Sequence, residues 1–239
     1  MILCVQYNKG AVIMKIFSVP YAIGDSRTYI ETKRRVEPLA KFISFDYPGH
    51  GFRINEPLLR TIEELADDVY RNIMKEGIDE DYCLLGYSMG VLVCREVYFK
   101  LAENKCRLPK MLFLCACPSP GYKYKNNDIY NCSRDEVIEI LRDYGGTSEV
   151  ALQSDELMDL VIPMARADLG AIEQYVAKID FKKIESKGII VYSNKEKENI
   201  KNWDTVFESE CDYYHIDGNH FFINEQIEAV SDIINKYLG

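Results

Sequence analysis

The feature that most constrains the fold is an alternation of short apolar runs with segments of helical periodicity. Runs rich in Val, Ile, Phe and Tyr are typical of strands, and several here are apolar almost throughout, as expected when helices cover both faces of a sheet. The expected strands span residues 12–19, 41–46, 82–85, 111–117, 188–192 and 213–216. This order predicts an α/β fold with a mostly parallel central sheet flanked by helices.

Helical patterns occupy the intervals between these runs. The second begins at Thr61, which is followed three residues later by Glu64, the spacing of a capping box. The last carries an apolar stripe that is suited to packing on a sheet. The expected helices span residues 26–35, 61–75, 89–103, 200–208 and 226–237.

One long interval departs from the alternation. Between residues 118 and 183 there is no convincing strand, only helical stretches over 134–143 and 155–178, the second expected to divide near Pro163. This interval is far longer than a crossover connection between two parallel strands needs. We expect a single domain over residues 1–239 with a helical lid inserted at 118–183, the alternative being a second small helical domain.

Charge and cysteine content narrow the class of protein. The 239 residues include 29 Lys and Arg against 38 Asp and Glu, a net charge of −9, which argues against nonspecific binding to nucleic acid or anionic membranes. None of the eight cysteines forms a C-x-x-C pair, so buried reduced thiols are expected rather than disulfides or a zinc site. The chain also shows neither a basic leader nor an apolar run of the roughly 18 residues that a membrane helix needs. We therefore expect a cytoplasmic protein without a metal site.

The segment Gly86-Tyr87-Ser88-Met89-Gly90 carries the clearest chemical signal. It is a G-x-S-x-G motif between an expected strand and an expected helix, the pattern of a nucleophile elbow. The sharp turn exposes the serine hydroxyl, and the flanking glycines leave room for the neighbouring strand and helix. The N–H groups at the helix N-terminus can bind a developing oxyanion. Ser88 is therefore the candidate nucleophile.

Three histidines could serve as the base. His50 follows an early strand, and His215 lies within the strand expected at 213–216. His220 follows the end of that strand and precedes the last helix, and the carboxyl ends of parallel strands are where such sheets place their sites. His220 is the preferred base.

A carboxylate should follow the preceding strand and orient the base. The loop 193–199 contains Glu196 and Glu198 but no aspartate, and a glutamate can hold the imidazole tautomer. A merely solvated loop is the alternative for either glutamate, with Asp204 and Asp217 as further candidates. The oxyanion hole is expected to use the N–H of Met89 together with that of Tyr21 or Ala22, in the loop after the first strand.

Four segments follow one another along the chain: FSVPYAIG at 17–24, DYPGHG at 46–51, GYSMG at 86–90 and GNHFF at 218–222. In this order they resemble the type II thioesterases that accompany nonribosomal peptide and polyketide synthases. A further stretch at 160–168 is similar to the signature of that family in its lid. The resemblance extends from about residue 15 to 237.

The resemblance implies an α/β-hydrolase fold with a helical lid, a Ser–His–acid triad and no cofactor. By position it assigns Ser88 as nucleophile, His220 as base, and Met89 with Ala22 as oxyanion donors. The sequence departs from the family by having Ile23 for glycine, Tyr87 for histidine and Asn219 for glycine. Lys197 falls nearest to the position of the family's aspartate, between the two candidate glutamates.

The implied activity is hydrolysis of acyl thioesters on the phosphopantetheine arm of acyl or peptidyl carrier proteins, by a monomer. The alternatives are a carboxylesterase or other hydrolase, and a non-catalytic binding protein on the same scaffold. Carrier proteins are typically acidic, as this chain is, so local basic residues would have to dock them. Lys123 and Lys125 are candidates, although a solvated loop explains them as well.

Overall fold

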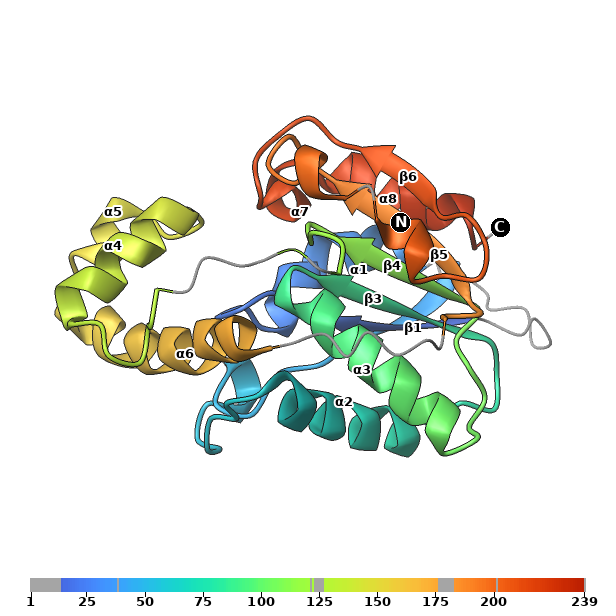
Figure 1. Cartoon of the computed structure of the whole chain (residues 1–239), viewed down its shortest axis with the longest axis horizontal. Helices are drawn as coiled ribbons and strands as arrows, with labels where there is room; N and C mark the ends of the chain where they lie inside the picture. Colours follow the sequence, from blue (N-terminus) through green and yellow to red (C-terminus); the bar gives the residue numbers. More distant parts are fainter. Residues whose placement is uncertain are drawn as a thin grey trace, which may run out of the picture.

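A computed structural model describes residues 14–37, 39–120, 122, 127–175, 183–200 and 202–238. Within these ranges, a six-stranded sheet has the order β2-β1-β3-β4-β5-β6, and all five pairings are parallel (Figure 1). The strands are β1 (Met14–Val19), β2 (Ala40–Ser44), β3 (Tyr82–Tyr87), β4 (Met111–Cys115), β5 (Lys187–Tyr192) and β6 (Asp212–His215). The expected α/β architecture is confirmed, with strand ends that lie within two residues of the expected positions.

Successive side chains of the central strands enter opposite hydrophobic cores. In β3, Leu84 packs in one core while Cys83 and Leu85 pack in the other, and all three are fully buried. Leu112 and Phe113 divide in the same way along β4. Because strand side chains alternate between faces, a strand buried on both faces must be apolar at consecutive positions. This is why the strand-forming runs lack polar alternation.

Helices cover both faces of the sheet. Helices α2 (Ile62–Glu76) and α3 (Met89–Glu103) pack together on one face, whereas α1 (Ile30–Val36) and α8 (Ile227–Lys236) pack together on the other (Figure 1). The first expected helix begins as a 3-10 turn, Ser26–Tyr29, that leads into α1. As expected, the Thr61 hydroxyl caps α2 by accepting the N–H of Glu64.

Three helices of the described residues lie between β4 and β5. They are α4 (Arg134–Tyr144), α5 (Glu149–Leu152) and α6 (Asp155–Gln174), and they extend from the end of the sheet where β3 stops and α3 begins (Figure 1). The expected break near Pro163 is wrong, because α6 continues through this residue. A proline inside a helix costs about 3 kcal/mol, but Met158, Ile162 and Ala165 of α6 are buried in the core, and this packing outweighs that cost.

The helix expected over 200–208 is also wrong. Its described residues form only a 3-10 turn, Trp203–Thr205, and Phe207 makes an isolated bridge to Ile184. The reason is tertiary, since Trp203 and Phe207 both enter the core and the Asp204 carboxylate accepts the N–H of Cys211. A short helix that the sequence pattern did not indicate, α7 (Phe222–Glu225), precedes α8.

Several further expectations concern groups or segments rather than elements. The cysteines in the described ranges are free thiols, most of them buried. No helix in those ranges is long and apolar enough to cross a bilayer. Lys123 and Lys125, the candidate docking residues, lie outside the described residues.

Candidate active site

Ser88 stands at the turn between β3 and α3. Its φ is +51° and its ψ is −114°, a conformation that few residues other than glycine adopt. The Ser88 N–H donates to the carbonyl oxygen of Cys115 on the neighbouring strand at 2.8 Å, which anchors the strained turn to the sheet. Strain of about 1–3 kcal/mol at such a residue persists only where the surroundings impose it. The hydroxyl is thereby held at the carboxyl end of the sheet.

The two elbow glycines are required by close backbone approaches. A Cβ at Gly90 would lie 2.3 Å from the carbonyl oxygen of Val19 in β1. A Cβ at Gly86 would lie 2.5 Å from the carbonyl oxygen of Gly90 itself. The glycines therefore allow α3 to start directly against β1 and β3, as the motif indicates.

We expect Gly90→Ala to lower the free energy of unfolding by about 3 kcal/mol, since the obstructing atoms belong to backbone rather than to adjustable side chains. Gly77→Ala is the matched control. Its new Cβ would meet nothing closer than 3.6 Å, so only the backbone conformation, with φ +79° and ψ +142°, opposes it, at about 1–2 kcal/mol. Urea unfolding of both variants measures the difference, and equal losses would contradict this account of the elbow.

His220 lies against the serine hydroxyl and a buried carboxylate. Its Nε2 is 3.1 Å from Ser88 Oγ, and its Nδ1 is 2.8 Å from Oε1 of Glu196. An ionised carboxylate only accepts hydrogen bonds, so Nδ1 carries a proton and Nε2 is left to accept the Ser88 hydroxyl proton. The arrangement has the hydrogen-bond pattern of a nucleophile, base and orienting acid.

Glu196 is 3% exposed and is held on its other oxygen by Ser193. Oε2 accepts the Ser193 N–H at 2.9 Å and the Ser193 hydroxyl at 2.7 Å. Burial alone would raise the pKa of Glu196, but the hydrogen bonds from His220 and Ser193 hold it below its ordinary value. The carboxylate is therefore ionised at neutral pH. Sequence reasoning missed Ser193, although its three-residue spacing from Glu196 was visible.

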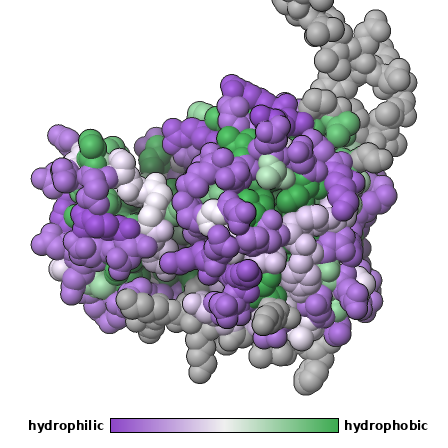
Figure 2. All heavy atoms as spheres, turned by 90° about the horizontal axis from the view of Figure 1, so that it is seen from above, coloured by the Kyte–Doolittle hydropathy of each residue, from purple (hydrophilic) through white to green (hydrophobic). Residues whose placement is uncertain are grey.

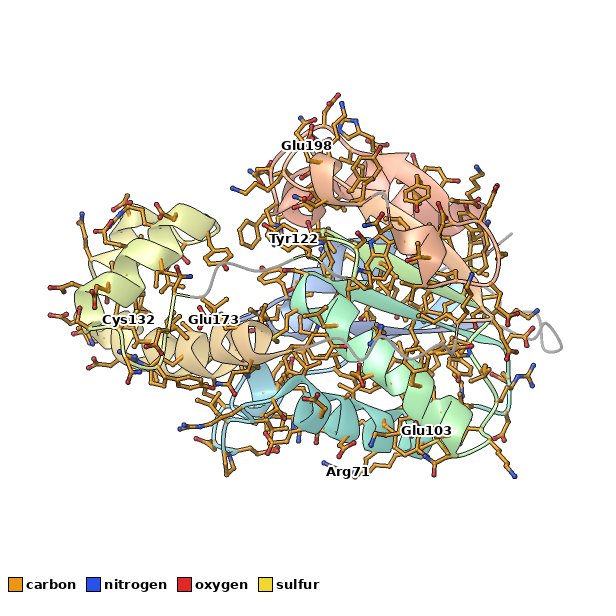
Figure 3. All side chains as sticks on the ribbon, viewed as in Figure 1. Arg71, Glu103, Tyr122, Cys132, Glu173 and Glu198 are labelled. Atoms are coloured by element: carbon orange, nitrogen blue, oxygen red, sulfur yellow. The ribbon has the colours of Figure 1, made fainter. Side chains whose placement is uncertain are left out.

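The other acidic candidates lie elsewhere. Glu198 is exposed, on the 3-10 turn Lys197–Asn199 at the outer surface of the molecule (Figure 3). The Asp204 carboxylate accepts the N–H of Cys211. Asp217 is exposed, and its Oδ1 lies 3.9 Å from Nδ1 of His215. The structure thus brings Glu196, rather than these three residues, to His220.

Two residues that depart from the family pattern hold the His220 loop. The Tyr87 hydroxyl donates to the carbonyl oxygen of His220 at 2.6 Å and accepts the N–H of Ile223 at 3.3 Å. Asn219 accepts the N–H of Phe221 at 2.6 Å and donates to the carboxylate of Glu225. Both side chains therefore hold the loop that bears the imidazole by hydrogen bonds.

The expected oxyanion donors line the cavity that also contains Ser88. Met89 is the first residue of α3, where the backbone N–H groups have no partner within the helix. Tyr21 and Ala22 lie in a turn closed by the Gly24 N–H, which donates to the Tyr21 carbonyl at 3.0 Å. The residues Tyr21, Ala22 and Met89 line the same cavity as Ser88.

This cavity has a volume of about 280 Å³ and a mainly apolar wall. Leu92 of α3, Leu141 of α4, and Leu169 and Ile172 of α6 contribute to the wall, and Ser88, Glu196 and His220 line the same cavity. In the surface view, apolar (green) and intermediate (white) residues lie between the insertion formed by α4, α5 and α6 and the rest of the molecule (Figure 2). Half-exposed Tyr122, also in the wall, lies between the insertion and the C-terminal part of the chain (Figure 3). The site can therefore receive an apolar chain beside a nucleophile.

The remaining histidines occupy other places. His215 lies on the edge strand β6, and its Nε2 is 2.8 Å from Oδ1 of Asn194. His50 is buried against Asp168 of α6, at 3.0 Å. Among the described residues, no cluster of His, Cys, Asp or Glu could hold a metal ion.

Known proteins share this arrangement of elements. Residues 14–238 match the family model "Thioesterase domain". The chain is 23% identical over 239 residues to the human "S-acyl fatty acid synthase thioesterase, medium chain", covering 97% of this chain and 88% of that protein.

Two solved structures are similar throughout. RedJ, a thioesterase from the prodiginine biosynthetic pathway in Streptomyces coelicolor, superposes with a TM-score of 0.86 at 24% identity, covering 96% of this chain and 92% of RedJ. YbtT, a type II thioesterase from the yersiniabactin NRPS/PKS biosynthetic pathway, has a TM-score of 0.80 at 22% identity, covering 95% and 94%. Because the family model matches nearly the whole length of this chain, the chain belongs to the thioesterase domain family.

Proposed function

We propose that this protein is a serine thioesterase that hydrolyses acyl thioesters on the phosphopantetheine arms of carrier proteins, as an editing type II thioesterase. The observation that carries the proposal is the hydrogen-bonded series Ser88–His220–Glu196 in the wall of a mainly apolar cavity. The name of YbtT supports the type II assignment, because it places a similar chain in an NRPS/PKS pathway.

In the first step, Ser88 Oγ attacks the thioester carbonyl carbon while its proton passes to Nε2 of His220. Glu196 stabilises the resulting imidazolium through the Nδ1 hydrogen bond. The N–H groups of Met89 and Ala22 bind the oxyanion. The intermediate collapses to an acyl-Ser88 ester, and the departing thiolate takes the proton from Nε2.

In the second step, water replaces the thiol. The water oxygen attacks the acyl-Ser88 carbonyl carbon while Nε2 of His220 accepts a proton from the water. Nε2 then returns this proton to Ser88 Oγ as the carboxylic acid leaves. The acyl chain occupies the cavity between α3 and the helical insertion throughout. We propose that residues 118–183 act as a lid, because α4 and α6 supply part of the wall that excludes water from the ester.

Turnover of three substrates tests the proposal: an acyl thioester on a carrier protein, the same acyl group on CoA, and a simple aryl ester. We expect kcat/KM to be highest for the carrier-protein thioester, because binding of the carrier contributes to transition-state stabilisation. A fluorophosphonate probe should label Ser88. Preference for the aryl ester would favour a carboxylesterase, and absence of labelling with absence of turnover would favour a binding protein.

The wall of the cavity predicts acyl-chain preference. Ile172 contributes to the wall at α6, so Ile172→Ala should favour longer acyl chains, because the space of the three lost carbon atoms becomes available. One methylene in an apolar pocket is worth about tenfold or more in kcat/KM. A series of acyl-thioester lengths measures the shift. Leu160→Ala is the matched control, since Leu160 lies on the same helix but is 57% exposed, and an equal shift there would contradict the assignment.

A further inference from the structure

Asp168 is a fully buried carboxylate on α6 that the proposed chemistry does not use. Its Oδ2 accepts the backbone N–H of Ile23 at 2.6 Å and lies 3.0 Å from Nε2 of His50. Its Oδ1 is buried and has no hydrogen-bond partner among the described residues. Burying a carboxylate costs free energy, and leaving one of its oxygens without a hydrogen bond costs more. We therefore expect a carboxylate in this position to have a function.

His50 completes a pair with this carboxylate. Its Nδ1 lies 3.1 Å from the carbonyl oxygen of Pro48, which can only accept, so Nδ1 carries a proton. Burial lowers the pKa of His50, but the hydrogen bond and charge of Asp168 outweigh this effect and raise it above its ordinary value. The contact between the His50 imidazole and the Asp168 carboxylate thus joins the loop after β2 to helix α6.

The backbone that Asp168 contacts is strained. Ile23 has a φ of +67° at the third position of the turn closed by Gly24 and Tyr21, whereas Ala22 is not among the residues with positive φ. This is the pattern of a type II turn, whose third position favours glycine. A β-branched residue there is a marked outlier, and the N–H that it presents is the one that Asp168 accepts.

We propose that Asp168, oriented by His50, is a positioning residue for the oxyanion hole. By holding the Ile23 N–H, it keeps the turn in the conformation that directs the preceding N–H, of Ala22, to the cavity beside Ser88. The inference rests on the proposed function, because an oxyanion hole has a role only in acyl transfer. It also links the hole to the acyl pocket, since Leu169, next to Asp168 on α6, lines the cavity.

Two substitutions of similar shape separate hydrogen bonding from packing. Asp168→Asn, with its amide oxygen in the position of Oδ2, keeps an acceptor for the Ile23 N–H and removes the charge. Asp168→Leu keeps the approximate shape and removes the acceptor. The readout is the second-order rate of Ser88 labelling by a small fluorophosphonate, whose phosphoryl oxygen occupies the oxyanion hole and which needs no natural substrate.

Loss of one oxyanion donor costs about 10²–10³ in rate, and loss of its positioning should cost a part of that. We expect Asp168→Leu to label at least tenfold more slowly than wild type and Asp168→Asn within threefold of wild type. In thioester hydrolysis, the leucine variant should lower kcat while KM changes little. Equal labelling rates for the two variants, or a loss confined to KM, would overturn the proposal.

Glu173 provides the matched control, because it is a carboxylate on the same helix that also accepts backbone N–H groups, those of Asn127 and Ile129. It extends from α6 within the insertion (Figure 3). Glu173→Leu should label within threefold of wild type. A rate as low as that of Asp168→Leu would mean that any loosening of α6 has this effect, which would refute a specific role for Asp168.

A second variant keeps the test valid if Asp168→Leu does not fold. Incorporation of the α-hydroxy analogue of isoleucine at position 23 replaces the amide by an ester and removes only the N–H that Asp168 accepts. We expect labelling at least tenfold slower, and an unchanged rate would overturn the proposal. A wild type that labels but hydrolyses no thioester refutes the proposed function alone, whereas one that does neither overturns both.

Discussion

Replacing Ser88 by alanine is expected to lower kcat for thioester hydrolysis by about 10⁴–10⁶-fold. The hydroxyl is the nucleophile of the proposed reaction, and the rest of the site cannot form the acyl-enzyme without it. Because oxyanion donors and pocket remain, a residual rate of about 10³-fold over water can persist. Single-turnover hydrolysis of a carrier-protein thioester, with product followed by mass spectrometry, measures the loss.

Ser231→Ala is the matched control for this experiment. Ser231 is buried, and its hydroxyl donates to the Ile227 carbonyl within α8, on the face of the sheet opposite α3. This variant should hydrolyse the thioester at the wild-type rate. Undiminished turnover by Ser88→Ala would remove the proposed nucleophile and the mechanism with it.

The second large effect is expected at Glu196. In Glu196→Gln the amide can donate to Nδ1 of His220, which favours the tautomer with its proton on Nε2 and leaves no acceptor for the Ser88 hydroxyl proton. The comparable loss of an orienting carboxylate costs about 10⁴ in amide cleavage. We expect about 10²–10⁴ here, because a thiolate leaves more readily than an amine. Steady-state kcat at neutral pH measures it.

Glu198→Gln is the control, two residues along the same loop and exposed to solvent. It should leave kcat within about threefold of wild type, since Glu198 does not contact the imidazole. A loss as large as that of Glu196→Gln would contradict the assignment of the acid.

The pKa of Glu196 adds a dependence of stability on pH. Because its folded-state pKa lies below its ordinary value, the ionised carboxylate stabilises the protein above that ordinary value, and this contribution is lost as the pH falls through the folded-state pKa. The free energy of unfolding of wild type should therefore fall toward that of Glu196→Gln in acid. Urea unfolding of both proteins from neutral pH to about pH 3 follows the difference.

The elements whose identity is local were predictable from the sequence. Helix α3 has the bounds expected from its pattern, because Gly90 and the apolar residues after it settle where it starts and what it packs against. The strands of the central sheet were predictable because burial on both faces demands continuous apolar runs. The elbow placed Ser88 at the end of β3 for the same reason, since the motif contains its own strand, turn and helix start.

The choice between Glu196 and Glu198 needed the tertiary structure. Both lie in one polar loop, and only the packing of that loop against the sheet buries the first beside His220 and leaves the second in water. Segment 200–208 has helical periodicity, yet Trp203 and Phe207 gain more by entering the core than a helix would provide.

The sequence by itself determined the sheet, the elbow serine and the histidine that follows the last strand, because each depends on neighbours a few residues away. Only the tertiary structure joined Ile23 to Asp168, which are 145 residues apart, and paired His50 with the same carboxylate. The physical reason is that a buried polar group is defined by its partners. Those partners come from segments whose meeting depends on the packing of the whole chain.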